Sequence, residues 1–285
     1  MRAPVPLWLI PIMAESEVPS IRGPRDRRRS GRERVRLLLD ILYTILRFIA
    51  RHVSGFWGAL AAFLTFAVAV AVAAGAVFAG MAHLVSKGMT QSFDESVLSS
   101  LAAMRTPLLD AAMLEITMLG TGSVILLTIG TVSLFLWLTN HKWSMSLLLI
   151  SVISGQIVNQ ALKQIFARPR PSIVDWGVEV STLSFPSGHA MTSTIAFSCI
   201  AYLVGRLSPT AAMRNSVYGI AALIILAIAF SRMYLGVHYP SDVIAGIVAG
   251  LGWLAFVAAT LTAVGFFAKR RPETHTEEED LQASS

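Results

Sequence analysis

The chain has 285 residues, of which 54% are hydrophobic and only 14% are charged, and its formal net charge is +6. Soluble domains usually carry about 25% charged residues, so this composition excludes an ordinary soluble protein. Several apolar runs reach the roughly 20 residues that a helix needs to cross a bilayer, which indicates a polytopic membrane protein. The positive excess is local, so it bears on orientation in the membrane and not on nucleic-acid binding. The single cysteine, Cys199, excludes an internal disulfide and is expected to be a buried packing residue.

The N-terminal region is basic before it becomes apolar. Residues 1–34 are predicted to be a disordered cytoplasmic tail, and eight arginines lie between Arg22 and Arg36. Such a cluster suits the anionic head groups of a cytoplasmic leaflet. In residues 35–56 the apolar positions recur at helical spacing, but Arg47 and Arg51 interrupt them. This pattern predicts an interfacial helix and not a membrane span.

Six apolar runs follow, and each is predicted to be a transmembrane helix. They cover residues 57–85, 120–138, 143–166, 189–207, 216–234 and 242–268. A more polar stretch separates the first two runs and contains amphipathic pieces at residues 93–104 and 108–118. We therefore predict an all-α fold with one membrane domain, residues 35–268, in which the six spans occupy residues 57–268. Residues 269–285 form a second cytoplasmic tail.

The placement of lysine and arginine predicts the orientation of the spans. With six spans, one side of the membrane carries the N-terminal arginines, Lys142, Arg206, Arg214 and residues 269–271. Positive residues favour the cytoplasmic side, so both termini are expected in the cytoplasm and the protein in the inner, cytoplasmic membrane. The loops with Arg170, His189 and His238 then face the extracytoplasmic side.

A turn at the start of the fourth span is well suited to bind an anion. Pro186 and Gly188 break regular structure, Ser187 is a natural helix N-cap, and His189 follows directly. The turn therefore directs backbone N–H groups, a hydroxyl and an imidazole towards one point at a helix N-terminus. Unpaired N–H groups and the helix dipole both favour negative charge there.

Three cations lie at the ends of other spans. Lys163 is near the end of the third span, Arg170 precedes a proline in the following loop, and Arg232 is near the end of the fifth span. A cation within a membrane segment costs several kcal/mol, so such residues usually face a polar cavity. The alternative for Lys163 and Arg232 is that the side chain extends to the interface.

A histidine and a carboxylate are four residues apart at the start of the sixth span. If this part is helical, His238 and Asp242 lie on one face and can form a hydrogen bond. Alternatively, His238 is an interfacial histidine and Asp242 a helix cap. Taken together, two histidines, a carboxylate, three cations and a helix N-terminus describe phosphoryl transfer through a phosphohistidine. One histidine attacks phosphorus, the carboxylate fixes its tautomer, the second histidine protonates the leaving oxygen, and the cations hold the phosphate oxygens.

These residues carry a resemblance to a known family. The sequence resembles the phosphatidic acid phosphatase type 2 / haloperoxidase superfamily, whose motifs are Lys-x6-Arg-Pro, Pro-Ser-Gly-His and Ser-Arg-x5-His-x3-Asp. Here the motifs are Lys163 with Arg170-Pro171, Pro186-Ser187-Gly188-His189, and Ser231-Arg232 with His238 and Asp242. Arg168 before Pro169 offers a rival register, but only Arg170 keeps the family spacing.

The resemblance implies a role for each matched residue. His238 is the expected nucleophile, Asp242 its orienting partner and His189 the general acid. The expected phosphate-binding residues are Lys163, Arg170, Ser187, Gly188 and Arg232. The phosphatase branch of this family needs no metal, and no cofactor is expected here.

The implied function is an integral-membrane phosphatase that acts on lipid phosphates. Undecaprenyl diphosphate is the favoured substrate by analogy with the family, because its recycling needs dephosphorylation at the outer face. Phosphatidic acid and phosphatidylglycerophosphate are the other candidates. The alternatives are a lipid phosphotransferase of the same fold and a non-enzymatic lipid-phosphate binder or transporter. A vanadate-dependent haloperoxidase is disfavoured, because those relatives are soluble. The expected partners are the lipid substrate and the bilayer, and the sequence does not indicate an oligomeric state.

Overall fold

All the regular structure of the described residues is helical. The computed structural model describes residues 56–178, 180 and 182–268, so both predicted tails and nearly all of the predicted interfacial helix lie outside it. The helices are α2 (Phe56–Ser86), α3 (Gln91–Ala103), α4 (Pro107–Met118), α5 (Gly122–Leu138), α6 (Lys142–Phe166), α7 (Gly188–Leu207), α8 (Ala211–Tyr234) and α9 (Pro240–Ala268). The predicted all-α class is confirmed, and the predicted spans agree with the long helices to within a few residues.

Five of these helices are long and apolar enough to cross a membrane: α2, α6, α7, α8 and α9. The second predicted span is shorter, because α5 has 17 residues, which rise about 26 Å against roughly 30 Å of hydrocarbon. It continues from α4 through a bend of 44°. Counted as one bent span, α4 and α5 supply the sixth crossing.

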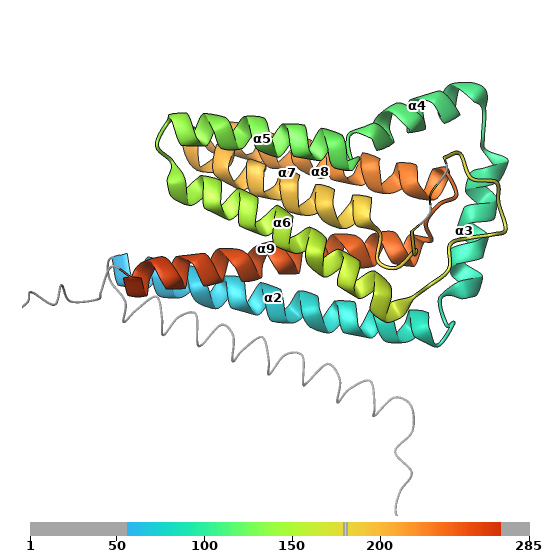
Figure 1. The fold of residues 1–285 in the computed structure, drawn as a ribbon, viewed down its shortest axis with the longest axis horizontal. Helices are drawn as coiled ribbons and strands as arrows, with labels where there is room; N and C mark the ends of the chain where they lie inside the picture. The colour runs from blue at the N-terminus through green and yellow to red at the C-terminus, as the bar shows by residue number, and fades with distance from the viewer. Residues whose placement is uncertain (1–55, 179, 181, 269–285) are drawn as a thin grey trace, which may run out of the picture. The chain divides into compact units, whose positions relative to one another are not determined.

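Helix α7 lies among its neighbours and packs against α6, α8 and α9. The main apolar core includes Leu147 and Leu148 of α6 and Ile195 and Cys199 of α7, all of which are buried. The expectation that Cys199 is a packing residue is therefore confirmed. Figure 1 shows α5 to α9 running side by side, with α3 and α4 at one end of the bundle.

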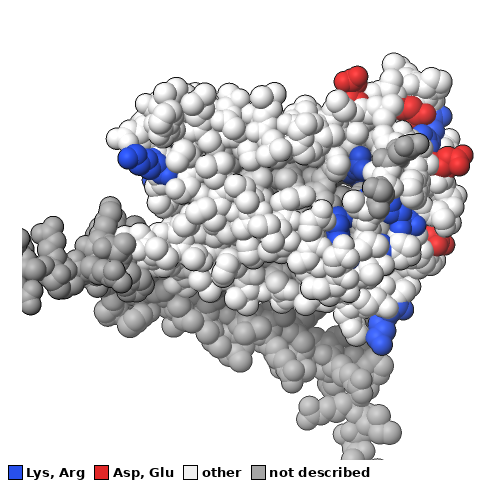
Figure 2. Space-filling view, viewed as in Figure 1, with Lys and Arg blue, Asp and Glu red and all other residues white. Residues whose placement is uncertain are grey.

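The sides of the bundle are apolar, as contact with lipid requires, and the charged side chains lie at its ends. On the face drawn in Figure 2, charged side chains gather at the two ends, and the long wall between them carries none. Large apolar side chains point outwards along the helices; Leu126 is 65% exposed and Leu223 is 68% exposed. Helices satisfy their own backbone hydrogen bonds, so such a wall is stable in a bilayer.

The end of α6 brings the three motifs to one end of the bundle. The helix stops at Ala167, which has a left-handed φ of 44°, and Pro169 and Pro171 then prevent its continuation. The loop 167–187 then connects the end of α6 to the start of α7. The C-terminal ends of α6 and α8 and the N-terminal ends of α7 and α9 therefore meet.

Candidate active site

The three motifs meet around one cavity of about 530 Å³. The predicted site residues that line it are Lys163, Arg170, Gly188, His189, Arg232 and His238. Asp242 lies behind His238, and Ser187 is buried in the turn before Gly188. The structure thus brings together all eight residues that the sequence singled out.

His238 and Asp242 form a pair, although not as residues of one helix. Their Nδ1 and Oδ2 atoms are 3.5 Å apart, but α9 begins at Pro240, so His238 lies before the helix and the helical condition considered above is not met. The contact arises because Asp242 lies in the first turn of α9 and reaches back. The same oxygen accepts a hydrogen bond of 3.0 Å from the backbone N–H of Tyr239. Asp242 therefore caps its helix and also pairs with the histidine.

The hydrogen bonds of His238 define its tautomer. Arg170 Nη1 lies 3.2 Å from Nε2, and because arginine can only donate, Nε2 carries the lone pair. The proton is then on Nδ1, next to Asp242. Burial lowers the pKa of His238 from 6.5 to about 3, although Asp242 partly opposes this effect. The imidazole is consequently neutral near pH 7, with Nε2 on the side of Arg170 and the cavity.

Two buried donor atoms at or next to the cavity wall lack protein partners in the described part of the chain. Arg232 Nε and Ser187 Oγ are both buried and have no hydrogen-bond partner among the described residues. Leaving a buried donor unsatisfied costs about 1–3 kcal/mol. The first N–H groups of α7 are also free of intrahelical acceptors, as at every helix start. Gly188 allows close packing here, because a Cβ atom at this position would lie 3.1 Å from Asn159 Oδ1.

Neighbouring side chains and carbonyls hold the cations in place. Arg170 donates from Nη2 to Thr182 Oγ1 over 2.8 Å and from Nε to the Thr182 carbonyl over 2.6 Å. Arg232 donates from Nη1 to Thr117 Oγ1 over 2.8 Å. Lys163 donates to the carbonyl of Leu183. Thr117 and Thr182 were not predicted, because nothing in their local sequence marks them as partners of a distant arginine.

His189 is differently placed from His238. It is the second residue of α7 and lines the cavity, and its imidazole makes no hydrogen bond with another described residue. Ser184, a residue that sequence reasoning missed, is fully buried behind the site. Its hydroxyl donates to Asp242 Oδ2 over 2.5 Å and lies 3.3 Å from His238 Nδ1. The two histidines thus face one space, but only His238 has a carboxylate behind it.

Arg168, considered above only as a rival for the motif arginine, has a separate place. It does not line the cavity, and its Nη1 atom lies 2.6 Å from Asp242 Oδ1, on the far side of the carboxylate from His238. The spacing argument for Arg170 as the cavity residue agrees with this geometry.

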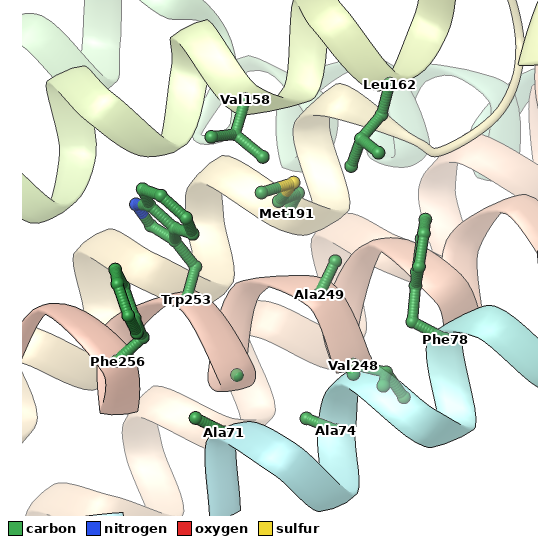
Figure 3. A pocket seen from close by; sticks show the side chains of 12 residues that line it. Ala71, Ala74, Phe78, Val158, Leu162, Met191, Val248, Ala249, Trp253 and Phe256 are labelled. Carbon is green, nitrogen blue, oxygen red and sulfur yellow. The ribbon is translucent and has the colours of Figure 1, made fainter. Parts of the chain in front are cut away.

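A second hollow, of about 260 Å³, lies between α2, α6, α7 and α9. Figure 3 shows its lining, which includes Phe78, Met191, Trp253 and Phe256. No titratable side chain is among the described residues that line it, so the chemistry belongs to the first cavity. Across residues 56–178, 180 and 182–268, no three His, Cys, Asp or Glu side chains are grouped as a metal site requires.

Comparisons with known proteins agree with this arrangement. The sequence pattern of the PAP2 superfamily matches residues 144–266. Phosphatidylglycerophosphatase B of Bacillus subtilis is 33% identical over 172 residues, which cover 60% of this chain and 84% of that protein. Decaprenylphosphoryl-5-phosphoribose phosphatase of Mycolicibacterium smegmatis is 40% identical over 88 residues, 30% of this chain and 42% of that one.

A solved structure shares the fold. The crystal structure of a transmembrane PAP2-type phosphatidylglycerolphosphate phosphatase from Bacillus subtilis superposes with a TM-score of 0.62 at 30% identity. The match covers 71% of this chain and 98% of that chain. With three motifs around one cavity, a matching fold and a relative covered over most of its length, this chain belongs to the PAP2 superfamily, in its membrane-embedded phosphatase branch.

Proposed function

We propose that this protein removes phosphate from a lipid phosphate or diphosphate through a phosphohistidine. Undecaprenyl diphosphate is the favoured substrate, and phosphatidic acid and phosphatidylglycerophosphate are the other candidates. One observation carries the proposal: Arg232 Nε, a buried donor without an acceptor among the described residues, lies at a cavity that also holds a neutral imidazole, and the unpaired Ser187 Oγ belongs to the residue before Gly188 of the cavity wall. An anion with several oxygens satisfies these donors, and a phosphoryl group is such an anion.

The proposed reaction has two steps. His238 Nε2 attacks phosphorus, the N–P bond forms, and the P–O bond to the leaving group breaks as His189 delivers a proton to the leaving oxygen. Asp242 accepts the hydrogen bond from Nδ1 and stabilises the positive charge that develops on the ring. Water then attacks phosphorus and gives a proton to His189, and the N–P bond breaks with its electron pair returning to Nε2, which releases phosphate and restores both histidines. Lys163, Arg170 and Arg232 neutralise the equatorial oxygens in both steps.

The shape of the cavity supports a lipid substrate. Away from the cations, its wall is formed by Ile125 and Ile129 of α5 and by Ile153 and Ile157 of α6. Ile153 is 55% exposed and Ile157 is 66% exposed, so this wall reaches the outer surface of the bundle. In a bilayer, an apolar tail can lie along α5 and α6 while the phosphate head reaches the cations.

The orientation supports the favoured substrate. Lys142, Arg206 and Arg214 lie at the end of the bundle opposite the cavity. If that end is cytoplasmic, the site faces the extracytoplasmic side of the inner membrane, where a carrier diphosphate is left after its cargo has been transferred. A non-enzymatic binder is less suitable, because binding alone needs neither a nucleophile nor a carboxylate behind it.

Phosphate release by the purified protein in detergent tests this proposal. We expect release from undecaprenyl diphosphate above that from phosphatidic acid and phosphatidylglycerophosphate, and we expect the rate to persist in chelator because the site supplies its own cations. Release from none of the three would contradict the function. Loss of activity in chelator that magnesium restores would contradict the metal-free mechanism.

A further inference from the structure

A buried ion network lies behind the site, outside the three motifs. Arg168 bridges two carboxylates: its Nη1 atom is 2.6 Å from Asp242 Oδ1, and its Nη2 atom is 2.9 Å from Asp94 Oδ2. Asp94 and Asp242 are both 0% exposed, and Arg168 is 9% exposed. Asp94 comes from α3, which lies at the end of the bundle where the motifs meet (Figure 1).

Neighbouring groups complete the coordination of this network. Ser241 donates from its backbone N–H to Asp94 Oδ1 over 3.0 Å and from its hydroxyl to Asp94 Oδ2 over 2.5 Å. Arg168 Nη1 also donates to Ser241 Oγ over 2.8 Å. The guanidinium lies 4.1 Å above the ring centre of Tyr239. The guanidinium of Arg168 therefore has hydrogen bonds along its edge and an aromatic ring against its face, which leaves the side chain little freedom to move.

The network fixes the carboxylate that faces the nucleophile. Asp242 Oδ1 is occupied by Arg168, whereas Oδ2 is shared by Ser184, Tyr239 and the Nδ1 side of His238. Rotation of the carboxylate would break the ion pair with Arg168 and remove Oδ2 from the imidazole. Burying an ion network costs desolvation energy that apolar packing of the same volume avoids, so stability alone is a weak reason for its presence.

We propose that Arg168 and Asp94 are positioning residues for the reaction: Arg168 holds the Asp242 carboxylate with Oδ2 towards His238, and Asp94 holds Arg168. This inference rests on the proposed function, because it concerns the orientation of the proposed nucleophile. It makes α3 part of the reaction machinery, although α3 contributes no residue to the cavity.

The charges of Arg168, Asp94 and Asp242 predict how activity and thermal stability rank among variants of this network. Arg168→Gln leaves two buried carboxylates close together with no cation between them. Asp94→Asn leaves the Arg168–Asp242 ion pair intact. The double variant Asp94→Asn/Arg168→Gln removes one charge of each sign, so we expect it to be more active and more thermostable than Arg168→Gln alone.

The test measures kcat, the inhibition constant of inorganic phosphate and the melting temperature in detergent. We expect Arg168→Gln to lower kcat by on the order of 10²-fold, since misplacement by about 1 Å has that effect. Inhibition by inorganic phosphate should change little, because Lys163, Arg170 and Arg232 are untouched and the phosphate ion binds without forming a bond to His238. Arg168→Lys should recover part of kcat, and Asp94→Asn should be milder than Arg168→Gln. Arg105→Gln is the matched control, because Arg105 pairs with Asp110 at the same end of the bundle.

Three results would overturn the inference. The first is a wild-type kcat in Arg168→Gln. The second is an equal loss of kcat and of inorganic-phosphate binding in Arg168→Gln, with no recovery in Arg168→Lys, which would mean that the network is only structural. If Arg168→Gln does not fold, the third result decides. A wild-type kcat in both Asp94→Asn and Arg168→Lys would then overturn the inference. Failure of the proposed function is a different result, namely no phosphate release by the wild-type protein.

Discussion

His238 and His189 face the same cavity but have different surroundings. His238 has Asp242 and Ser184 on its Nδ1 side, so its ring is oriented before any substrate binds. The imidazole of His189 makes no hydrogen bond with another described residue and lies at the start of α7. An oriented, neutral imidazole suits attack on phosphorus, and an unconstrained one suits delivery of a proton to leaving groups of different shapes.

This difference predicts that the decrease in rate caused by removing His189 depends on the leaving group of the substrate. General acid help is worth about 10²–10⁴-fold, and an alkoxide leaving group needs it more than a phosphate anion does. We therefore expect His189→Ala to slow release from phosphatidic acid more than release from undecaprenyl diphosphate, in single-turnover measurements. His141→Ala is the control, because His141 is exposed and lies at the opposite end of the bundle. Equal losses on both lipids would reject the acid role.

Motif spacing was enough to predict the cationic and imidazole side chains that line the cavity, but not the residues that hold them. Lys163, Arg170 and His238 could be found because their chemistry recurs at defined spacings. Asp94 and Ser184 could not, since each is an ordinary polar residue until the fold brings Asp94 to Arg168 and Ser184 to Asp242, which are 74 and 58 residues away along the chain respectively. Their partners are set by the packing of α3 and of the loop 167–187.

The first turn of α9 approaches the start of α7 very closely. The backbone N–H of Ser187 donates to the carbonyl of Asp242 over 3.0 Å. A Cβ atom at Gly246 would lie 2.7 Å from the Ser187 carbonyl oxygen and 3.1 Å from Ala190 Cβ. A glycine on α9 therefore sets the distance between the element with Asp242 and the turn proposed to bind phosphate.

Gly246→Ala should accordingly damage both the fold and the reaction. Overpacking of this kind costs about 1–3 kcal/mol, and it separates α9 from the turn, so we expect a lower melting temperature and a lower kcat. Gly265→Ala is the matched control on the same helix, because a Cβ atom there would meet no atom within 4 Å. A Gly246→Ala protein as stable and active as Gly265→Ala would show that this close approach is unimportant.

Hydropathy predicted the bounds of the long helices well, but it did not predict how the shorter helices α4 and α5 are joined. Runs such as Lys142–Phe166 are apolar over the length of a span, so their ends are set by charge and by proline. The bend between α4 and α5 was not predicted, because Gly120 and Thr121 interrupt the helix without changing the hydropathy much. The sequence left open whether His238 is helical, and the structure answers this, since α9 begins at Pro240, two residues after His238.

The two ends of the bundle differ in role. We propose that the end with Lys142, Arg206 and Arg214 is cytoplasmic, and the other end carries the site. We expect Ser172→Cys, in the exposed part of the loop 167–187, to react with a membrane-impermeant thiol reagent in intact cells. His141→Cys, at the opposite end, should react only after the cells are opened. Both variants need a Cys199→Ala background, although Cys199 is buried. Labelling of His141→Cys in place of Ser172→Cys would reverse the orientation.

Trapping of the phosphorylated protein tests the central claim, that His238 carries the phosphoryl group. A lipid substrate labelled with ³²P in the transferred phosphoryl group is mixed with excess protein, and the reaction is stopped in alkaline detergent, in which a phosphoramidate survives. The wild type should retain label that acid removes, and His189→Ala should retain label from a diphosphate. His238→Ala, checked to be folded by its melting curve, should retain none. Label on His238→Ala, or label on the wild type that resists acid, would contradict the phosphohistidine mechanism.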